Sequence, residues 1–141
     1  MPLVRISLQS GKPGSYKATV CEQVYQAMRE TLPIPDGDRF QVITEHDGST
    51  LIADPAFMGM RRSADFALIQ IFLSRGRTTE VKQALYRRIT ERLADSPGVR
   101  SDDVMIVLTE VGLDDWSFGR GEAQYVLNPP AWARKQDKVP A

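Results

Sequence analysis

The stretch that decides the fold lies in the middle of the chain and reads Phe66-Ala67-Leu68-Ile69-Gln70-Ile71-Phe72-Leu73. It is the longest apolar run of the sequence, and Gln70 is its only polar residue. Branched aliphatic and aromatic residues dominate it, which is typical of a β-strand. A strand with so little alternation is expected at the centre of a sheet or buried on both faces. We therefore predict a central strand over residues 66–73.

The sequence after this strand predicts a helix and then a further strand. Thr78 is a candidate N-cap, and apolar residues recur at four-residue intervals from Val81 to Leu93. Pro97-Gly98 ends the helical pattern, and residues 104–111 read as another apolar strand. The crossover is long enough for the two strands to pair in parallel, and such crossovers are right-handed in about 98% of cases.

The first half of the chain has the same order of elements. Residues 3–8 read as a strand, the apolar stripe from Val20 to Met28 indicates a helix, and residues 40–46 read as a second strand. The halves are also related residue by residue, because Val42-Ile43-Thr44-Glu45 corresponds to Val107-Leu108-Thr109-Glu110. The sequence therefore contains an internal repeat of a strand–helix–strand unit.

This repeat predicts an α/β (α+β) fold. Two consecutive βαβ units would form a four-stranded, mainly parallel sheet with two helices on one face. The opposite face would be bare, and apolar surface of that size is usually covered by oligomerisation. We expect a single domain over residues 1–128, with repeats at 2–62 and 63–127, followed by a C-terminal arm or disordered tail at 129–141.

Composition excludes several classes of function. Among 141 residues, 18 basic residues balance 18 acidic ones, so neither nucleic acid nor a membrane surface is an expected partner. No apolar run approaches the roughly 18 residues of a transmembrane helix. With Cys21 and His46 as the only residues of their types, we expect no metal site and no disulfide, and a reducing, cytoplasmic location.

Two candidate sites carry positive charge. Removal of the initiator methionine would leave Pro2 with a free secondary amine, although many chains begin Met-Pro without any catalytic role. An α-amino group has an ordinary pKa near 8, so modest changes in its surroundings decide whether the Pro2 amine acts as an acid or as a base. The second site is Ser74-Arg75-Gly76-Arg77-Thr78, after the central strand. Its two guanidinium groups could hold one carboxylate, or the segment could be a solvated turn.

Two further candidates are an aspartate and an aromatic pair. Asp38 could orient water or keep the Pro2 amine protonated, although aspartate beside glycine and proline more often serves a turn. Trp116 and Phe118 belong to Asp115-Trp116-Ser117-Phe118-Gly119-Arg120-Gly121. They could wall a small apolar pocket, or they could pack a hairpin against the core.

Together these residues resemble the tautomerase superfamily, and within it the malonate semialdehyde decarboxylases. The resemblance spans roughly residues 2–127 and rests on three motifs. They are Asp38-Arg39-Phe40-Gln41 followed by Glu45-His46, then Ser74-Arg75-Gly76-Arg77-Thr78, and then Asp115-Trp116-Ser117-Phe118-Gly119-Arg120-Gly121. A proline at the head of the first strand accompanies them. One departure is Gly76, because the family pattern has a proline between the two arginines.

The resemblance implies a tautomerase-like domain, a homotrimer and no cofactor. It implies that Pro2, Asp38, Arg75 and Arg77 are catalytic, and that Arg75, Arg77, Trp116 and Phe118 bind a small carboxylate-bearing oxo acid. The implied reaction is decarboxylation of a short β-oxo acid with Pro2 as general acid, with possible hydratase or tautomerase side activity. Two alternatives stay open, namely keto–enol tautomerisation with Pro2 as general base, and a non-enzymatic trimeric binding module with a vestigial pocket.

Overall fold

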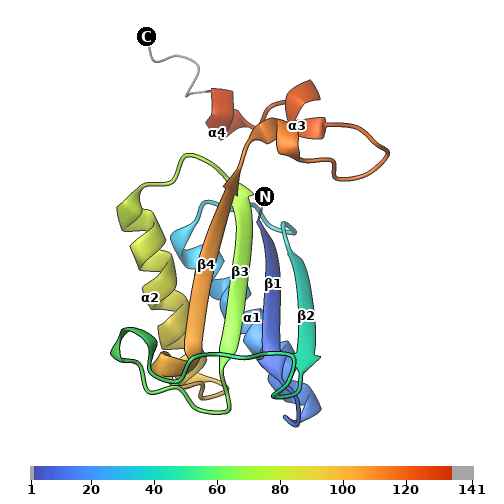
Figure 1. Cartoon of the computed structure of the whole chain (residues 1–141). Coiled ribbons are helices and arrows are strands. Elements are labelled where there is room, and N and C mark those ends of the chain that lie inside the picture. Colours follow the sequence, from blue (N-terminus) through green and yellow to red (C-terminus); the bar gives the residue numbers. More distant parts are fainter. Residues whose placement is uncertain (1, 135–141) are drawn as a thin grey trace.

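A computed structural model describes residues 2–134 and contains one four-stranded sheet (Figure 1). The sheet has the order β2-β1-β3-β4, with bounds Leu3–Gln9 (β1), Phe40–His46 (β2), Ala67–Ser74 (β3) and Val104–Val111 (β4). β1 pairs in parallel with β2, and β3 pairs in parallel with β4. The two inner strands, β1 and β3, pair antiparallel. The predicted sheet of two βαβ units, mainly parallel, is confirmed, and the units meet at an antiparallel junction.

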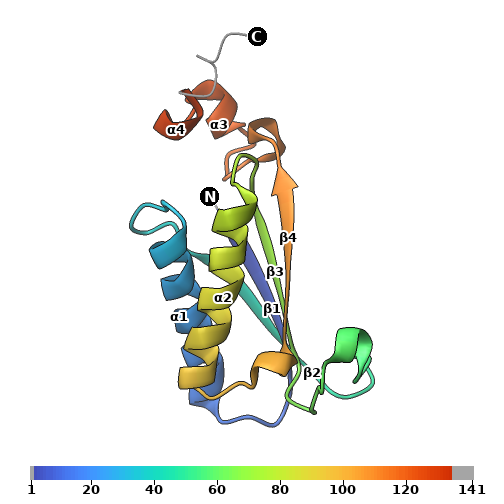
Figure 2. The same cartoon turned by 90° about the vertical axis from the view of Figure 1, so that its left-hand side faces the viewer.

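Both long helices, α1 (Gly14–Thr31) and α2 (Thr79–Asp95), lie on the same face of the sheet (Figure 2). Thr78 caps α2 as predicted, because its side-chain oxygen accepts a hydrogen bond from the Val81 backbone N–H at 3.2 Å. The apolar stripe of this helix points into the core, where its buried residues are Leu85, Ile89 and Leu93. The 3.6-residue period of the sequence thus decides which side of α2 meets the sheet.

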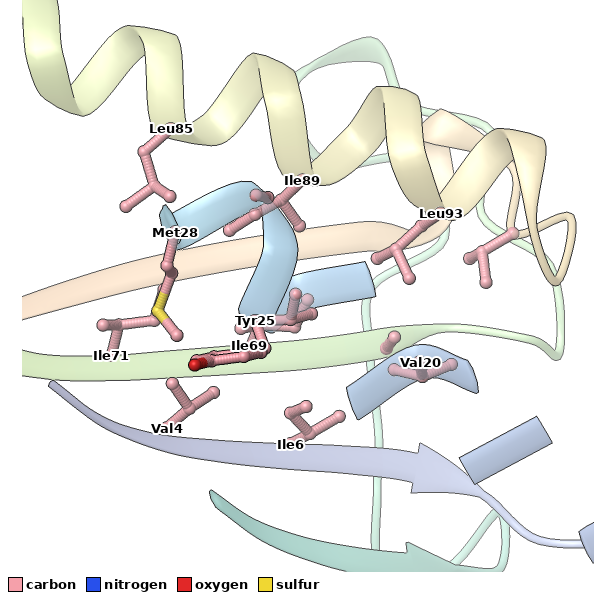
Figure 3. Close-up of a cluster of buried hydrophobic side chains, with 14 of the residues drawn as sticks. Val4, Ile6, Val20, Tyr25, Met28, Ile69, Ile71, Leu85, Ile89 and Leu93 are labelled. Atoms are coloured by element: carbon pink, nitrogen blue, oxygen red, sulfur yellow. The ribbon is translucent and has the colours of Figure 1, made fainter. Parts of the chain in front are cut away.

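The hydrophobic core fills the space between this helical layer and the sheet (Figure 3). β3 contributes alternate residues to it, and these are Ala67, Ile69, Ile71 and Leu73. The side chains between them on β3, Leu68, Gln70 and Phe72, lie on the other face and are half-buried. β3 is therefore a central strand, as predicted, with one face in the core of the chain.

The face of the sheet opposite the helices carries exposed apolar side chains. Four of them have exposed fractions between 39% and 49%: Phe40, Val42, Met105 and Val107. Figure 2 shows both long helices on one side of the sheet and neither of them on the other. The predicted bare apolar face is therefore present in the single chain.

The connecting segments lie at the two edges of the sheet where its strands begin and end, and not along its outer strands. At one edge, residues 47–64 form a long connection that contains a 3₁₀ helix, η1 (Phe57–Gly59), and is fixed to η2 (Ser101–Asp103). The buried Asp103 carboxylate accepts a hydrogen bond from the Ser63 backbone N–H at 2.6 Å. At the other edge lie η3 (Leu113–Asp115), α3 (Gln124–Leu127) and α4 (Ala131–Arg134). Within residues 2–134, no helix has the length and apolar character needed to cross a membrane.

The predicted arm or disordered tail, 129–141, falls only partly on described residues. Its first part contains α4, in which Ala133 is 7% exposed. Residues 135–141 lie outside the described range.

Candidate active site

The predicted site residues come from segments that meet at one edge of the sheet. β1 and β2 begin at this edge, and β3 and β4 end there, because the two inner strands are antiparallel. Pro2 directly precedes β1, Asp38 lies two residues before β2, and Arg75 directly follows β3. Figure 1 shows the start of β1 beside the end of β3. The pairing of the strands thus brings together groups that are more than 35 positions apart in the sequence.

Pro2 lies at the head of an inner strand and is fully buried. The next residue, Leu3, pairs with Phe40 on one side and with Phe72 on the other. The strands on both sides therefore fix the position of the proline ring. While Met1 is attached, the Pro2 nitrogen is a tertiary amide with no proton to donate, so acid–base chemistry at this atom requires removal of Met1.

The arginine pair sits in the turn between β3 and α2. Gly76, between the two arginines, has φ = 120°, a backbone conformation closed to proline, whose ring fixes φ near about −65°. The glycine that departs from the family pattern therefore gives this turn its shape. Glu110 holds the turn from the neighbouring strand through a hydrogen bond from the Gly76 backbone N–H and through an ion pair with Lys82. These contacts lower the pKa of Glu110 and keep its carboxylate charged.

Arg77 is the more enclosed member of the pair. Its Nη1 donates a hydrogen bond to the Ser74 carbonyl oxygen at 2.6 Å. Its buried Nε has no hydrogen-bond partner within the described part of the chain. Burial lowers the pKa of Arg77, while the charges of Glu110, Tyr125 and Asp38 act in the opposite direction. A buried guanidinium with an unused donor is suited to bind an anion, because such donors are normally satisfied.

The aromatic pair forms part of a row of rings behind this turn. Trp116 donates a hydrogen bond from Nε1 to the Ser74 Oγ at 3.2 Å, and its ring stacks on Phe118 with centroids 5.6 Å apart. Phe118 in turn meets Tyr125 edge to face at 4.7 Å. Burial is the main cause of the raised pKa of Tyr125, which keeps its hydroxyl protonated at neutral pH. Tyr125, at the other end of this row of ring contacts, lines a cavity.

That cavity has a volume of about 610 Å³ and opens beside the arginine turn. Asp38 and Arg77 are its charged lining residues, and the others are Pro33, Ile34, Pro35, Tyr125, Pro130 and Trp132. Two smaller neighbouring cavities, of about 170 and 200 Å³, add Arg75 to the lining. Pro2, Trp116 and Phe118 line none of these three cavities.

The structure thus adds lining residues that sequence reasoning did not assign to the site. Tyr125 and Trp132 lie in segments without a recognisable motif, and Trp132 falls in the predicted arm. Pro33, Ile34 and Pro35 lie between α1 and β2 and carry no reactive group that would mark them as site residues. A tryptophan directly after Pro129-Pro130 and Ala131 was the available signal for a packed segment. Within residues 2–134, no group of three or more His, Cys, Asp and Glu side chains is placed to hold a metal ion.

An edge with two arginines, a buried proline and an adjoining cavity has the groups needed to bind a small carboxylate. Comparison with known proteins identifies the family of the chain. Residues 38–119 match the family described as "Tautomerase enzyme". A probable tautomerase of Bacillus subtilis (strain 168), YusQ, is 38% identical over 126 residues, which cover 89% of this chain and 99% of YusQ. Another from the same organism, YrdN, is 32% identical over 126 residues, or 89% of this chain and 97% of YrdN.

A solved structure gives a similar result. The crystal structure of FG41 malonate semialdehyde decarboxylase inhibited by 3-bromopropiolate is 43% identical, with a TM-score of 0.85. The match covers 92% of this chain and 98% of that one. The chain belongs to the tautomerase family, and it is a tautomerase-superfamily enzyme of the decarboxylase or tautomerase type. The roles of Pro2, Asp38, Arg75, Arg77, Trp116 and Phe118 stay predictions.

Proposed function

We propose that this enzyme decarboxylates a short β-oxo acid of the malonate semialdehyde type, with the Pro2 amine as general acid. The observation that carries the proposal is the placement of Pro2 and the arginine pair at one edge of the sheet, next to a cavity. Arg75 and Arg77 bind and orient the carboxylate. The similarity to FG41 malonate semialdehyde decarboxylase, at 43% identity, supports this reaction over others.

In the proposed reaction, the bond between the carboxylate carbon and the α-carbon breaks and carbon dioxide leaves. The electron pair of that bond moves into the α-carbon–carbonyl unit to give an enolate. The protonated Pro2 nitrogen donates its proton to the developing oxyanion to give an enol. Water then protonates the enol at carbon while the enol O–H returns its proton to Pro2, which gives the aldehyde and restores protonated Pro2. The hydroxide that remains combines with carbon dioxide as bicarbonate. A positioned donor to a developing oxyanion contributes about 10²–10³ in rate.

Asp38 supports the charged form of Pro2 in this scheme. A carboxylate near an amine raises the pKa of that amine, whereas the two arginines lower it. Asp38 also lines the cavity beside Arg77. We infer that it balances the arginines and keeps Pro2 protonated near neutral pH, or activates water for a hydratase side reaction.

A second candidate function is keto–enol tautomerisation, because both B. subtilis relatives are called probable tautomerases. Here a neutral Pro2 would take a proton from carbon. The two functions predict opposite pH profiles. Decarboxylation by protonated Pro2 declines as pH rises through the amine pKa, whereas proton abstraction by neutral Pro2 increases over the same range.

The test is a panel of small oxo acids assayed for carbon dioxide release and for ketonisation, each over a range of pH. We expect release of carbon dioxide from malonate semialdehyde that falls at high pH, from protein whose intact mass is lower by one methionine residue. Ketonisation that rises with pH, without carbon dioxide release, would instead establish the tautomerase. No turnover above buffer across the panel, from protein without Met1, would favour the binding module.

We also propose that the chain assembles as a homotrimer through its bare sheet face. That face carries the exposed Phe40, Val42, Met105 and Val107. A structural neighbour with the same fold, the fused 4-OT wild type, is described as a symmetric trimer, at 21% identity and a TM-score of 0.74. Burial of such apolar surface between copies is the expected driving force.

The oligomeric state tests this assembly. Light scattering after size exclusion is expected to give three times the chain mass of 15.8 kDa. Val107→Glu places a charge on the face and is expected to yield monomers, because an unpaired charge is costly to bury. Gln83→Glu, at an exposed position of α2, is the matched control and should remain trimeric. A monomeric wild-type protein, or a Val107→Glu trimer, would contradict the proposal.

A further inference from the structure

Trp132, in the short helix α4, stands where the three cavities of the candidate site meet. It lines the large cavity together with Asp38 and Arg77, and it lines both small cavities together with Arg75. The next residue, Ala133, is 7% exposed and anchors the helix. The Trp132 ring therefore forms a shared wall between the arginine turn and the space beside it.

The walls of the large cavity divide into a charged and an apolar part. Arg77 and Asp38 form the charged part. Pro33, Ile34, Pro35, Tyr125, Pro130 and Trp132 form the remainder, whose polar side-chain groups are the hydroxyl of Tyr125 and the indole N–H of Trp132. Aromatic and proline rings present flat, rigid apolar surface to a ligand. If the arginines hold the carboxylate of a ligand, the rest of that ligand can therefore reach the apolar part of the cavity wall.

The size of the cavity indicates what the apolar part accommodates. Its volume of about 610 Å³ is in the range of sites for organic ligands, roughly 300–1,000 Å³. A three-carbon oxo acid would occupy a small fraction of it and would leave the apolar wall in contact with water. An apolar substituent would displace that water and gain the free energy of burial.

We propose that Trp132, with Pro33 and Tyr125, forms an apolar subsite that binds an aromatic or branched apolar group of an oxo-acid substrate. This inference rests on the proposed function in one respect, that Arg75 and Arg77 hold the carboxylate. It extends the proposed substrate class from malonate semialdehyde to larger oxo acids that carry such a group at the end away from the carboxylate.

Calorimetric titration with two unreactive acids tests the subsite without any turnover. The probes are propionate and 3-phenylpropionate, which share a carboxylate and differ by a phenyl ring. The wild-type protein is expected to bind 3-phenylpropionate roughly ten- to a hundredfold more tightly, from the apolar area of one ring. Trp132→Ala is expected to remove most of this difference and to leave propionate affinity within about twofold, since Trp132 contributes area and no charge.

Two variants control for indirect effects. Trp132→Phe keeps an aromatic ring and is expected to retain most of the preference for the phenyl compound. Leu127→Ala removes an apolar side chain that is 70% exposed in α3 and lines none of the three cavities, so it should bind both acids as the wild type does. Thermal unfolding of each variant verifies that it is folded.

Three results would overturn the subsite. They are equal affinity of the wild-type protein for both acids, no binding of either acid in the millimolar range, and an equal loss for both acids in folded Trp132→Ala. Failure of the proposed function looks different: the phenyl preference and its loss in Trp132→Ala would be observed, but no oxo acid would be turned over.

Discussion

Replacement of Pro2 by alanine is expected to lower kcat/KM for the oxo-acid substrate by about 10²–10³. After removal of Met1 the variant still has an α-amino group, but it lacks the ring that fixes the nitrogen at the head of β1. Pro2 is fully buried between two paired strands, so the ring has little freedom in the wild-type chain. A primary amine on a flexible residue is a poorer proton donor to a developing oxyanion, because orienting the amine costs conformational entropy in each turnover.

The measurement is steady-state kinetics at several pH values, with the intact mass of each protein recorded. Pro13→Ala is the matched control, because Pro13 is an exposed proline before α1. It should retain wild-type rates. A form with one residue added before Pro2 has an amide at this nitrogen and should be at least as impaired as Pro2→Ala. Full activity in that extended form would contradict the role of Pro2.

Replacement of Arg77 by alanine is expected to reduce kcat/KM by about 10²-fold, mainly through KM. The change removes a charge-assisted contact to the substrate carboxylate, and such hydrogen bonds contribute about 1.5–3 kcal/mol each. Arg77 is the partly buried member of the pair, and its buried Nε has no hydrogen-bond partner among residues 2–134. Water in the variant would therefore be a poor substitute for the guanidinium as a donor to the carboxylate. Affinity for the unreactive propionate should fall together with the rise in KM.

Two variants distinguish this effect from a general loss of positive charge. Arg87→Ala removes an exposed arginine from α2 and should leave both KM and propionate affinity unchanged. Arg77→Lys retains the charge without the planar fork of donors, and we expect an intermediate affinity. If Arg77→Ala is folded and binds propionate as the wild type does, Arg77 does not hold the carboxylate.

The repeat and the hydrophobic periods determined much of the fold from the sequence alone. Apolar residues at four-residue intervals along α2 predicted which face is buried, and the nearly continuous apolar run at 66–73 predicted an inner strand. Such local patterns are readable because each side chain direction follows from the backbone period of its own element. The sequence also placed Arg75 and Arg77 after a strand, where α/β sheets commonly bind ligands.

Only the tertiary structure decided how the two units meet. The antiparallel pairing of β1 with β3 puts the start of one strand beside the end of the other, so Pro2 and the arginine turn share an edge. It also placed Trp132, from a segment predicted to be an arm, in the lining of the same cavity as Arg75 and Arg77. Contacts between residues this far apart depend on the complementarity of assembled surfaces, which no local period encodes. The sequence therefore determined the elements and their buried faces, and the packing of those elements formed the cavity.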